Sequence, residues 1–269
     1  MREFYHSRLS VSGQDRINEY AKRRLANIKI DRENMLKTGT VHVAIKFGNS
    51  ENGGVVTAAD HQISSWGKRS GSMDKIKLFS DFSTIGFAGS VLTIKATLDI
   101  IDDVLRYGKK EPDDLYLEGQ ATVIYNVLQT IGLLTDGYCD DFLFTGMDVT
   151  GPVILSYSGG CELWEEKFAS IGSGETDAIP LLLRDFEFID TEALSEKGAL
   201  KFAYSALRQV GRRDLGVGDS DKEMPQIIVV KASDSKILTD DEVRQIREEV
   251  LQESKVHADS RISPRTGGV

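Results

Sequence analysis

Short runs of apolar residues, several of them alternating with polar residues, recur along the chain and predict a structure rich in β-strands. The run at residues 41–47 alternates in part, and a second run at 54–60 follows it closely. The segment 48–53 between them is rich in Gly, Asn and Ser, which predicts a hairpin loop. We expect further strands at residues 76–79, 83–88, 141–147, 152–158, 161–169, 225–231 and 236–238.

Other segments repeat their apolar residues every three or four positions, which is the spacing of an amphipathic helix. We expect helices at residues 92–105, 123–131, 176–184, 191–210 and, with many acidic residues, 240–253. Strands therefore come in runs, separated by pairs of helices. Such runs favour layered sheets with helices outside them over alternating βαβ units.

The two ends of the chain differ from this central body. Residues 1–39 are polar and carry many Lys and Arg residues, with a helical pattern at 15–28. The pattern changes abruptly after Gly39, where the first strand begins. Residues 255–269 are polar, and we expect them to form a disordered tail.

Composition points to a globular protein. The chain has 269 residues, of which 40% are apolar and 28% charged, enough for a sizeable core. Its longest apolar runs have the length of strands and fall well short of the ~18 residues of a membrane span. The N-terminus lacks the apolar core of a secretory signal. We therefore expect a cytoplasmic protein that does not enter a membrane.

Charge and cysteine content narrow the function classes further. The formal net charge is -9 and no basic stripe is present, so nucleic-acid binding is not expected. The two cysteines, Cys139 and Cys161, do not make a disulfide framework, and no Cys/His cluster has the spacing of metal ligands. We expect no metal site and no cofactor.

The most informative segment begins at Gly39 and Thr40. The stretch GTVHVAIKF, followed by GGVVTAAD, resembles the opening of proteasome β-type subunits, which belong to the threonine peptidases with an N-terminal nucleophile. Four later stretches resemble that family in the same order, and the resemblance extends over roughly residues 40–253. These stretches are MDKI at 73–76, IGFAGS at 85–90, SIGSG at 170–174 and RDLGVG at 213–218.

The chemistry explains why a threonine would have to become the N-terminus. A threonine hydroxyl is a poor nucleophile unless a base takes its proton, and a free α-amino group can be that base. The amine has a reference pKa of about 7.7–8.0, which leaves a useful neutral fraction at physiological pH. Cleavage between Gly39 and Thr40 would create nucleophile and base in one step.

The resemblance also implies a role for each matching position. Thr40 would be the nucleophile, Lys75 a cation beside its hydroxyl, and Asp60 the partner of Lys75. Ser173 and Asp214 would orient the amine, and the backbone N–H of Gly89 would be the oxyanion donor. Ser64 would pair with the substrate backbone. The walls of an apolar specificity pocket would be Ile63, Phe87 and Val91.

For the whole molecule, the resemblance implies an α+β fold with four layers, in which two stacked antiparallel sheets lie between helical layers. Residues 1–39 would be a leader and residues 40–254 the peptidase domain. Subunits of this family form rings of seven that enclose their active sites. The implied partners are other β-type subunits, α-type rings and a ring ATPase, and the implied substrates are unfolded polypeptides.

Three departures from the family keep alternatives open. Val217 stands where the family usually has a serine that helps to orient the amine, which favours a non-catalytic β-type subunit as one alternative. His42 and Gln62 replace residues that are usually threonine and arginine, and the first hairpin loop is longer than is common. A second alternative is a relative of the same fold, either the peptidase of a simpler two-component ATP-dependent protease or an amidase.

Overall fold

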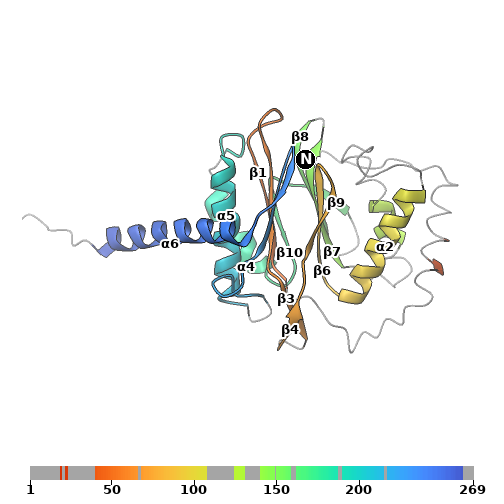
Figure 1. Ribbon diagram of the computed structural model, residues 1–269, viewed down its shortest axis with the longest axis horizontal. Coiled ribbons are helices and arrows are strands. Elements are labelled where there is room, and N and C mark those ends of the chain that lie inside the picture. The colour runs from red at the N-terminus through yellow and green to blue at the C-terminus, as the bar shows by residue number, and fades with distance from the viewer. Residues whose placement is uncertain are drawn as a thin grey trace, which may run out of the picture.

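The computed structural model describes the body of the chain from Thr40 onward, with gaps (Figure 1). The described residues are 19, 22–23, 40–65, 68–107, 124–130, 140–148, 150–158, 162–186, 190–214 and 217–262. Of the expected leader, only Glu19, Lys22 and Arg23 are among them, and they are helical. The rest of the leader, Gly39 included, lies outside the described residues, as do both cysteines.

One antiparallel sheet carries the first two expected strands at its centre. Its strand order is β10-β1-β2-β11-β12. The expected loop joins β1 to β2 with His42 opposite Ala59 and Phe47 opposite Gly54, so the hairpin prediction is confirmed. The strands are β1 (His42–Phe47), β2 (Gly54–Ala59), β10 (Phe168–Ile171), β11 (Gln226–Lys231) and β12 (Ser235–Ile237).

The second sheet is also antiparallel, and its strands follow one another in chain order, β5-β6-β7-β8-β9. These strands are β5 (Ile76–Ser80), β6 (Ser83–Ala88), β7 (Asp141–Asp148), β8 (Gly151–Ser158) and β9 (Glu162–Glu165). Figure 1 shows the two sheets face to face in the middle of the molecule. The strands expected at residues 76–79, 83–88, 141–147 and 152–158 are confirmed within one or two residues.

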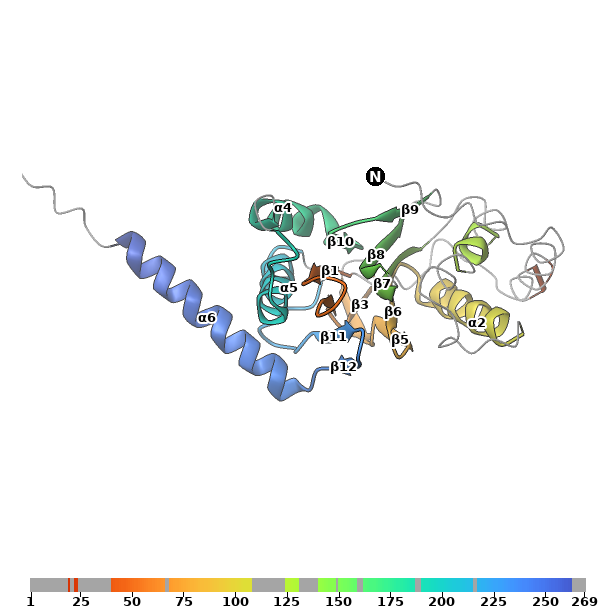
Figure 2. The same ribbon diagram turned by 90° about the horizontal axis from the view of Figure 1, so that it is seen from above.

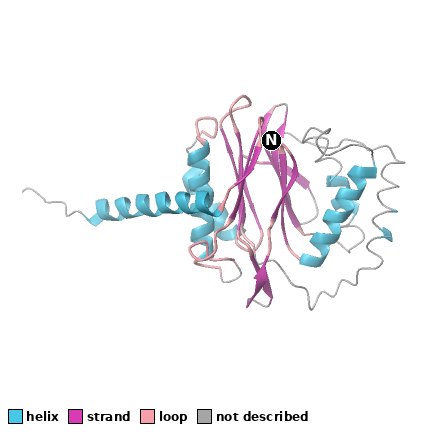
Figure 3. Ribbon diagram, viewed as in Figure 1, coloured by secondary structure: helices cyan, strands magenta, loops and turns pink. Residues whose placement is uncertain are grey.

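Helices lie on the outer face of each sheet, as Figures 1 and 3 show. On the side of the second sheet lie α2 (Val91–Tyr107) and the helical residues 124–130. On the side of the first sheet lie α4 (Glu175–Phe186) and α5 (Glu196–Gly211). The last helix, α6 (Asp240–Ile262), crosses the outside of α5 and projects beyond the body (Figure 2).

Alternation along the strands divides the apolar residues among these layers. In β1, Val43 and Ile45 belong to the cluster shared with α4 and α5, whereas Ala44 lies in the cluster between the two sheets. In β6, Ile85 packs towards α2 and Ala88 faces the first sheet. Successive side chains of a strand point to opposite faces, so each central strand contributes to two cores.

Local hydrogen bonds explain where the last two helices begin. The Ser195 hydroxyl accepts a hydrogen bond from the Gly198 N–H at 3.1 Å, as an N-cap of α5. At α6, the Thr239 N–H donates to the Glu242 carboxylate at 2.9 Å, and the Glu242 N–H donates back to the Thr239 hydroxyl at 3.4 Å. This reciprocal pair is a capping box.

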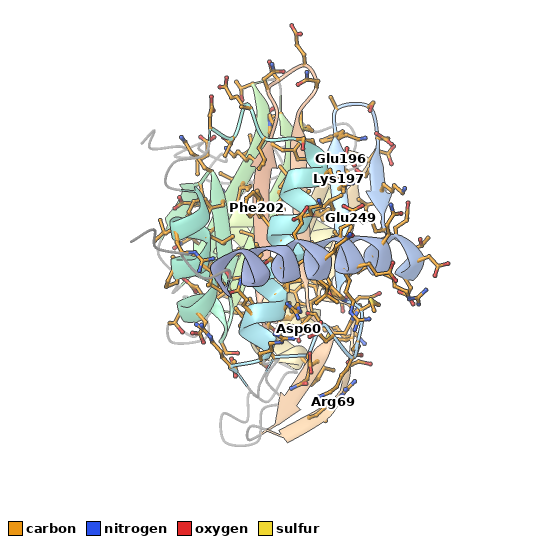
Figure 4. All side chains as sticks on the ribbon, turned by 90° about the vertical axis from the view of Figure 1, so that its left-hand side faces the viewer. Asp60, Arg69, Glu196, Lys197, Phe202 and Glu249 are labelled. Atoms are coloured by element: carbon orange, nitrogen blue, oxygen red, sulfur yellow. The ribbon has the colours of Figure 1, made fainter. Side chains whose placement is uncertain are left out.

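Ion pairs hold α6 across α5 (Figure 4). Glu249 of α6 accepts contacts from Lys197 at 2.9 Å and from Lys201 at 3.1 Å. Beneath them, Val243 and Val250 of α6 are buried in the cluster on the helix side of the first sheet. The half of α6 that lies on α5 is thus fixed by apolar packing and by charge.

The structure corrects three expectations. The stretch 161–169 is not one strand: β9 and β10 belong to different sheets, because the Glu166 N–H bonds to Ile154 of β8 and the Lys167 carbonyl accepts from Lys46 of β1. The hairpin of β3 (Gln62–Ser65) and β4 (Lys68–Ser72) was not expected, since its residues are largely polar. The expected disordered tail is wrong for residues 255–262, which continue α6.

No described helix combines the length and the apolar character that crossing a membrane would require.

Candidate active site

Asp60, at the end of β2, is the centre of a buried hydrogen-bond network. Its side chain is 2% exposed. One carboxylate oxygen accepts from the Val41 N–H at 3.0 Å, and the other accepts from the N–H groups of Gln62 and Gly218, each at 2.9 Å. Asp60 therefore ties the start of β1 to the loop that follows α5.

Lys75, at the start of β5, supplies the positive charge of this network. Its side chain is fully buried, and its Nζ lies 2.9 and 3.0 Å from the two carboxylate oxygens of Asp60. Burial lowers the pKa of Lys75, although the charge and the hydrogen bond of Asp60 oppose that shift. The predicted pairing of Asp60 with Lys75 is therefore present, next to the backbone of the residue that follows Thr40.

Thr40 comes directly before β1 and is completely buried. In this chain residues 1–39 are still attached, so the Thr40 nitrogen is a peptide N–H; it donates to the Ser173 hydroxyl at 3.3 Å. The Thr40 carbonyl accepts from the Gly174 N–H at 3.0 Å. Its hydroxyl makes no hydrogen bond with any described residue, so no hydrogen bond joins it to Lys75.

Ser173 links Thr40 to Asp214. The Ser173 hydroxyl lies 3.0 Å from the Asp214 carboxylate, and because it has a single proton it donates to Asp214 while accepting from the Thr40 N–H. Gly172 makes this approach possible. Its φ is +96°, and a Cβ there would lie 2.4 Å from the Thr40 carbonyl oxygen. Of the two residues predicted to orient the amine, Ser173 thus contacts the Thr40 nitrogen, and Asp214 contacts Ser173.

Val217 does not take part in this network. It is 3% exposed and belongs to the apolar cluster between the first sheet and its helices. In that cluster it lies beside Gly174, together with Val41 and Val210. The side chain that replaces the family's serine is therefore a core residue here, and the contact of Ser173 with Asp214 forms without it.

Gly89, at the end of β6, sits in a backbone conformation that requires glycine. Its φ is +141°, and a Cβ there would lie 2.0 Å from an oxygen of the Asp140 carboxylate. The same oxygen of Asp140 accepts the Ser90 N–H at 2.7 Å. Asp140 thus fixes the backbone orientation of the turn between β6 and α2.

The residues expected to bind substrate lie on three elements, β3, β6 and α2. Ile63 and Ser64 belong to β3, which pairs with β4 on one side and with no other described strand. A register shift falls between these two residues. Phe87 is buried in β6 and packs on the α2 side, and Val91 is the partly exposed first residue of α2.

His42 is a buried polar residue for which the resemblance to the family implied no role. Its imidazole is completely buried, and neither ring nitrogen has a hydrogen-bond partner among the described residues. Burial, and secondly the charge of Lys75, lowers the pKa of His42 to about 3. The only feature of the sequence that could have pointed to His42 is its position two residues after Thr40, on the same face of the strand.

Other parts of the described chain offer less chemistry. A cavity of about 600 Å³ lies beside the loop between β1 and β2, lined by residues that include Lys46, Ser50, Glu165 and Lys167. It contains none of the predicted site residues. Among the described residues, no group of three or more His, Cys, Asp and Glu side chains could hold a metal ion.

Comparisons with known proteins identify the family of this chain. The family model described as "Proteasome subunit" matches residues 36–222. The chain is similar to a proteasome subunit beta of Haloferax volcanii, with 29% identity over 185 residues, covering 68% of this chain and 71% of that protein. It is also similar to proteasome subunit beta 2 of Korarchaeum cryptofilum, with 28% identity over 178 residues, covering 66% and 88%. Since the family model covers well over half of the chain, the chain belongs to the proteasome subunit family, as a subunit of the β type.

Proposed function

We propose that this chain is a threonine-type endopeptidase subunit of a proteasome core particle, activated by its own cleavage between Gly39 and Thr40. One observation carries the proposal: the Thr40 N–H donates to the Ser173 hydroxyl, which donates to Asp214, while the adjacent Val41 N–H donates to Asp60 of the Asp60–Lys75 pair. The groups that would orient a new amine and stabilise a nucleophilic oxygen already surround this residue before cleavage.

The proposed self-cleavage uses the Thr40 hydroxyl as an internal nucleophile. Its oxygen attacks the carbonyl carbon of Gly39, and the acyl group passes from the Thr40 nitrogen to the oxygen as an ester. As the C–N bond breaks, the Thr40 nitrogen takes up the hydroxyl proton and becomes an α-amino group. Water then hydrolyses the ester, which restores the Thr40 hydroxyl and releases the leader with a carboxylate at Gly39. The hydrogen bond from the Thr40 N–H to the Ser173 hydroxyl and the one from the Gly174 N–H to the Thr40 carbonyl hold the residue on both sides of the reacting atoms.

In the mature enzyme the new amine takes the proton of the Thr40 hydroxyl, and the oxygen attacks a peptide carbonyl. Lys75 favours the deprotonated oxygen by its charge, and the Gly89 N–H is the proposed donor to the oxyanion that forms. The proton passes to the departing amine, and water hydrolyses the acyl-enzyme. In the proposed mechanism Ser64 pairs with the substrate backbone as an added strand, which the single pairing of β3 supports.

The pocket residues in this proposal favour apolar side chains of modest size. Ile63, Phe87 and Val91 would form its walls, and the burial of Phe87 against α2 supports a fixed wall. Because none of these three positions carries a charge, the pocket would bind a charged substrate side chain poorly. The free-energy cost of removing that charge from water would not be offset by an opposite charge.

We assign the fold to the four-layer αββα sandwich of the N-terminal-nucleophile hydrolases. Four separate apolar clusters support four layers: one outside each sheet and two between the sheets. We further propose assembly into rings with other β-type subunits, α-type rings at the ends and a ring ATPase that delivers unfolded polypeptides. A cytoplasmic location belongs to the same proposal.

The test is the N-terminus of the chain purified from particles assembled with α-type partners. Intact mass and N-terminal sequencing should give a chain beginning Thr-Val-His-Val, and hydrolysis of a peptide with an apolar residue before the cut should accompany it. Thr40→Ala should leave the leader attached and abolish hydrolysis, whereas Thr150→Ala, a matched exposed threonine on the β7–β8 turn, should change neither. A wild-type chain that stays uncut in complete particles would refute the proposal.

A second candidate is a non-catalytic β-type subunit. Two observations favour it: the amine network lacks the family's serine, and the Thr40 hydroxyl has no hydrogen-bond partner among the described residues. The sequencing experiment decides between the two, because a non-catalytic subunit keeps its leader in the assembled particle.

A further inference from the structure

The imidazole of His42 fills a space that β6 leaves for it. A Cβ on Gly86 would lie 1.5 Å from His42 Cε1, 2.2 Å from Nδ1 and 2.5 Å from Nε2. The ring therefore lies directly on the backbone of β6, and only glycine at position 86 allows that contact. Since β1 and β6 belong to different sheets, the ring packs between the two sheets.

These two strands carry the two ends of the proposed catalytic centre. His42 is two residues after Thr40, and Gly86 is three residues before Gly89. The Phe87 N–H also donates to the Lys75 carbonyl at 3.2 Å, so the same part of β6 is tied to the residue that carries the site's cation. A change in the spacing of β1 and β6 at His42 would move Thr40 relative to both Gly89 and Lys75.

The ring acts through its shape. Neither nitrogen bonds to a described residue, and the depressed pKa keeps the ring uncharged at neutral pH. A base for proton transfer works best with a pKa near the working pH, which this histidine does not have. A neutral ring also adds no second positive charge beside Lys75.

We propose that His42 is a positioning residue: a neutral wedge, seated on Gly86, that sets the distance between the strand leading from the nucleophile and the strand leading to the oxyanion donor. This inference rests on the proposed peptidase function. The His42–Gly86 pair would thus set the spacing of the catalytic groups. The sequence motifs did not indicate this role for either residue.

The pair makes a size-exchange experiment possible in the assembled particle. His42→Ala removes the wedge, and Gly86→Ala puts a methyl group where the ring lies, so each single variant should lower kcat by about 10- to 100-fold, the scale of an ångström-sized misplacement. KM should stay within about threefold. In the double variant the new methyl group partly fills the vacated space, so kcat should return to within about fivefold of wild type, a coupling between neighbours that a double-mutant cycle measures.

Ile154→Ala is the matched control, because Ile154 is another fully buried side chain between the two sheets but lies on β8. It should lower the thermal unfolding midpoint while leaving kcat within about twofold. The inference is overturned if His42→Ala keeps wild-type kcat, if the double variant is no better than the worse single variant, or if Ile154→Ala loses as much kcat as His42→Ala.

The same experiment separates this inference from the function on which it rests. If the wild-type chain is cut and active but the size exchange shows no coupling, only the role of His42 is refuted. If wild-type particles contain an uncut, inactive chain, the peptidase function fails, and the inference fails with it.

Discussion

At the scale of single residues, the most consequential feature is the asymmetry between Asp60 and Lys75. Asp60 accepts three backbone N–H groups as well as the ammonium of Lys75. The Lys75 ammonium is fully buried, and it lies 2.9 and 3.0 Å from the two oxygens of that carboxylate. Removing one partner of a buried ion pair is costly because the other charge loses its compensation.

We therefore expect Asp60→Asn to destabilise the fold by about 3–5 kcal/mol, since it leaves a buried cation and turns an amide N–H₂ towards backbone donors. Lys75→Met should cost less, because the Asp60 carboxylate keeps its three backbone donors. Both variants should lose cleavage at Gly39–Thr40. Denaturant unfolding of the two variants measures the difference, and equal costs would show that the backbone donors do not compensate the carboxylate.

At the scale of elements, the site depends on a turn between β10 and α4. Gly172 adopts a positive φ there, and its lack of a side chain lets the Thr40 carbonyl approach closely enough to accept the Gly174 N–H. The same turn presents Ser173 to the Thr40 nitrogen. One short loop thus supplies both the backbone support and the polar contact of the proposed nucleophile.

Gly172→Ala should destabilise the chain by more than about 1 kcal/mol and slow its cleavage at Thr40, because it adds backbone strain and a clash with the Thr40 carbonyl. Gly71→Ala in β4 is the matched control: the nearest atom to its new Cβ, Ile63 Cδ1, is 3.9 Å away, an ordinary contact. Its unfolding midpoint should stay near that of wild type. A tolerated Gly172→Ala, judged by mass spectrometry of the processed chain, would contradict this account of the turn.

At the scale of the whole molecule, two sheets and their outer helices form one frame around the site. Thr40 and Asp60 come from the first sheet, while Lys75 and Gly89 lie at the ends of strands of the second. Packing between the sheets therefore decides the geometry of the proposed catalytic groups. Beyond this frame, α6 projects past α5 (Figure 2) and places charged residues outside the body.

We expect the whole chain to assemble into rings. Native mass spectrometry of the chain co-expressed with α-type partners should give particles whose β rings hold seven subunits. The peptidase of the simpler two-component protease forms rings of six, so a six-membered ring that forms without α-type partners would support that alternative instead. The Thr40→Ala chain is a suitable second sample, because it removes the nucleophile while the frame that builds the ring stays the same.

Elements whose residues follow a regular apolar pattern could be predicted from the sequence, and elements without such a pattern could not. The strands at 42–47, 54–59, 76–80 and 83–88 were predictable because they are short apolar runs, in part alternating with polar residues, and turn residues separate them. The crossing at Glu166 was not, since no periodicity marks the point where a chain leaves one sheet for another. The polar β3–β4 hairpin and the last two turns of α6 were missed because their residues lack an apolar repeat.

The candidate catalytic residues could be named from the sequence because its motifs resemble those of proteasome β-type subunits. Most of the elements that carry them could be predicted because apolar periodicity is a property of the chain alone. The tertiary structure alone showed that Ser173 links the Thr40 nitrogen to Asp214, that Val217 packs in an apolar core, and that His42 lies on Gly86. These contacts join residues from different elements, and no local pattern encodes which residue of another element a side chain will meet.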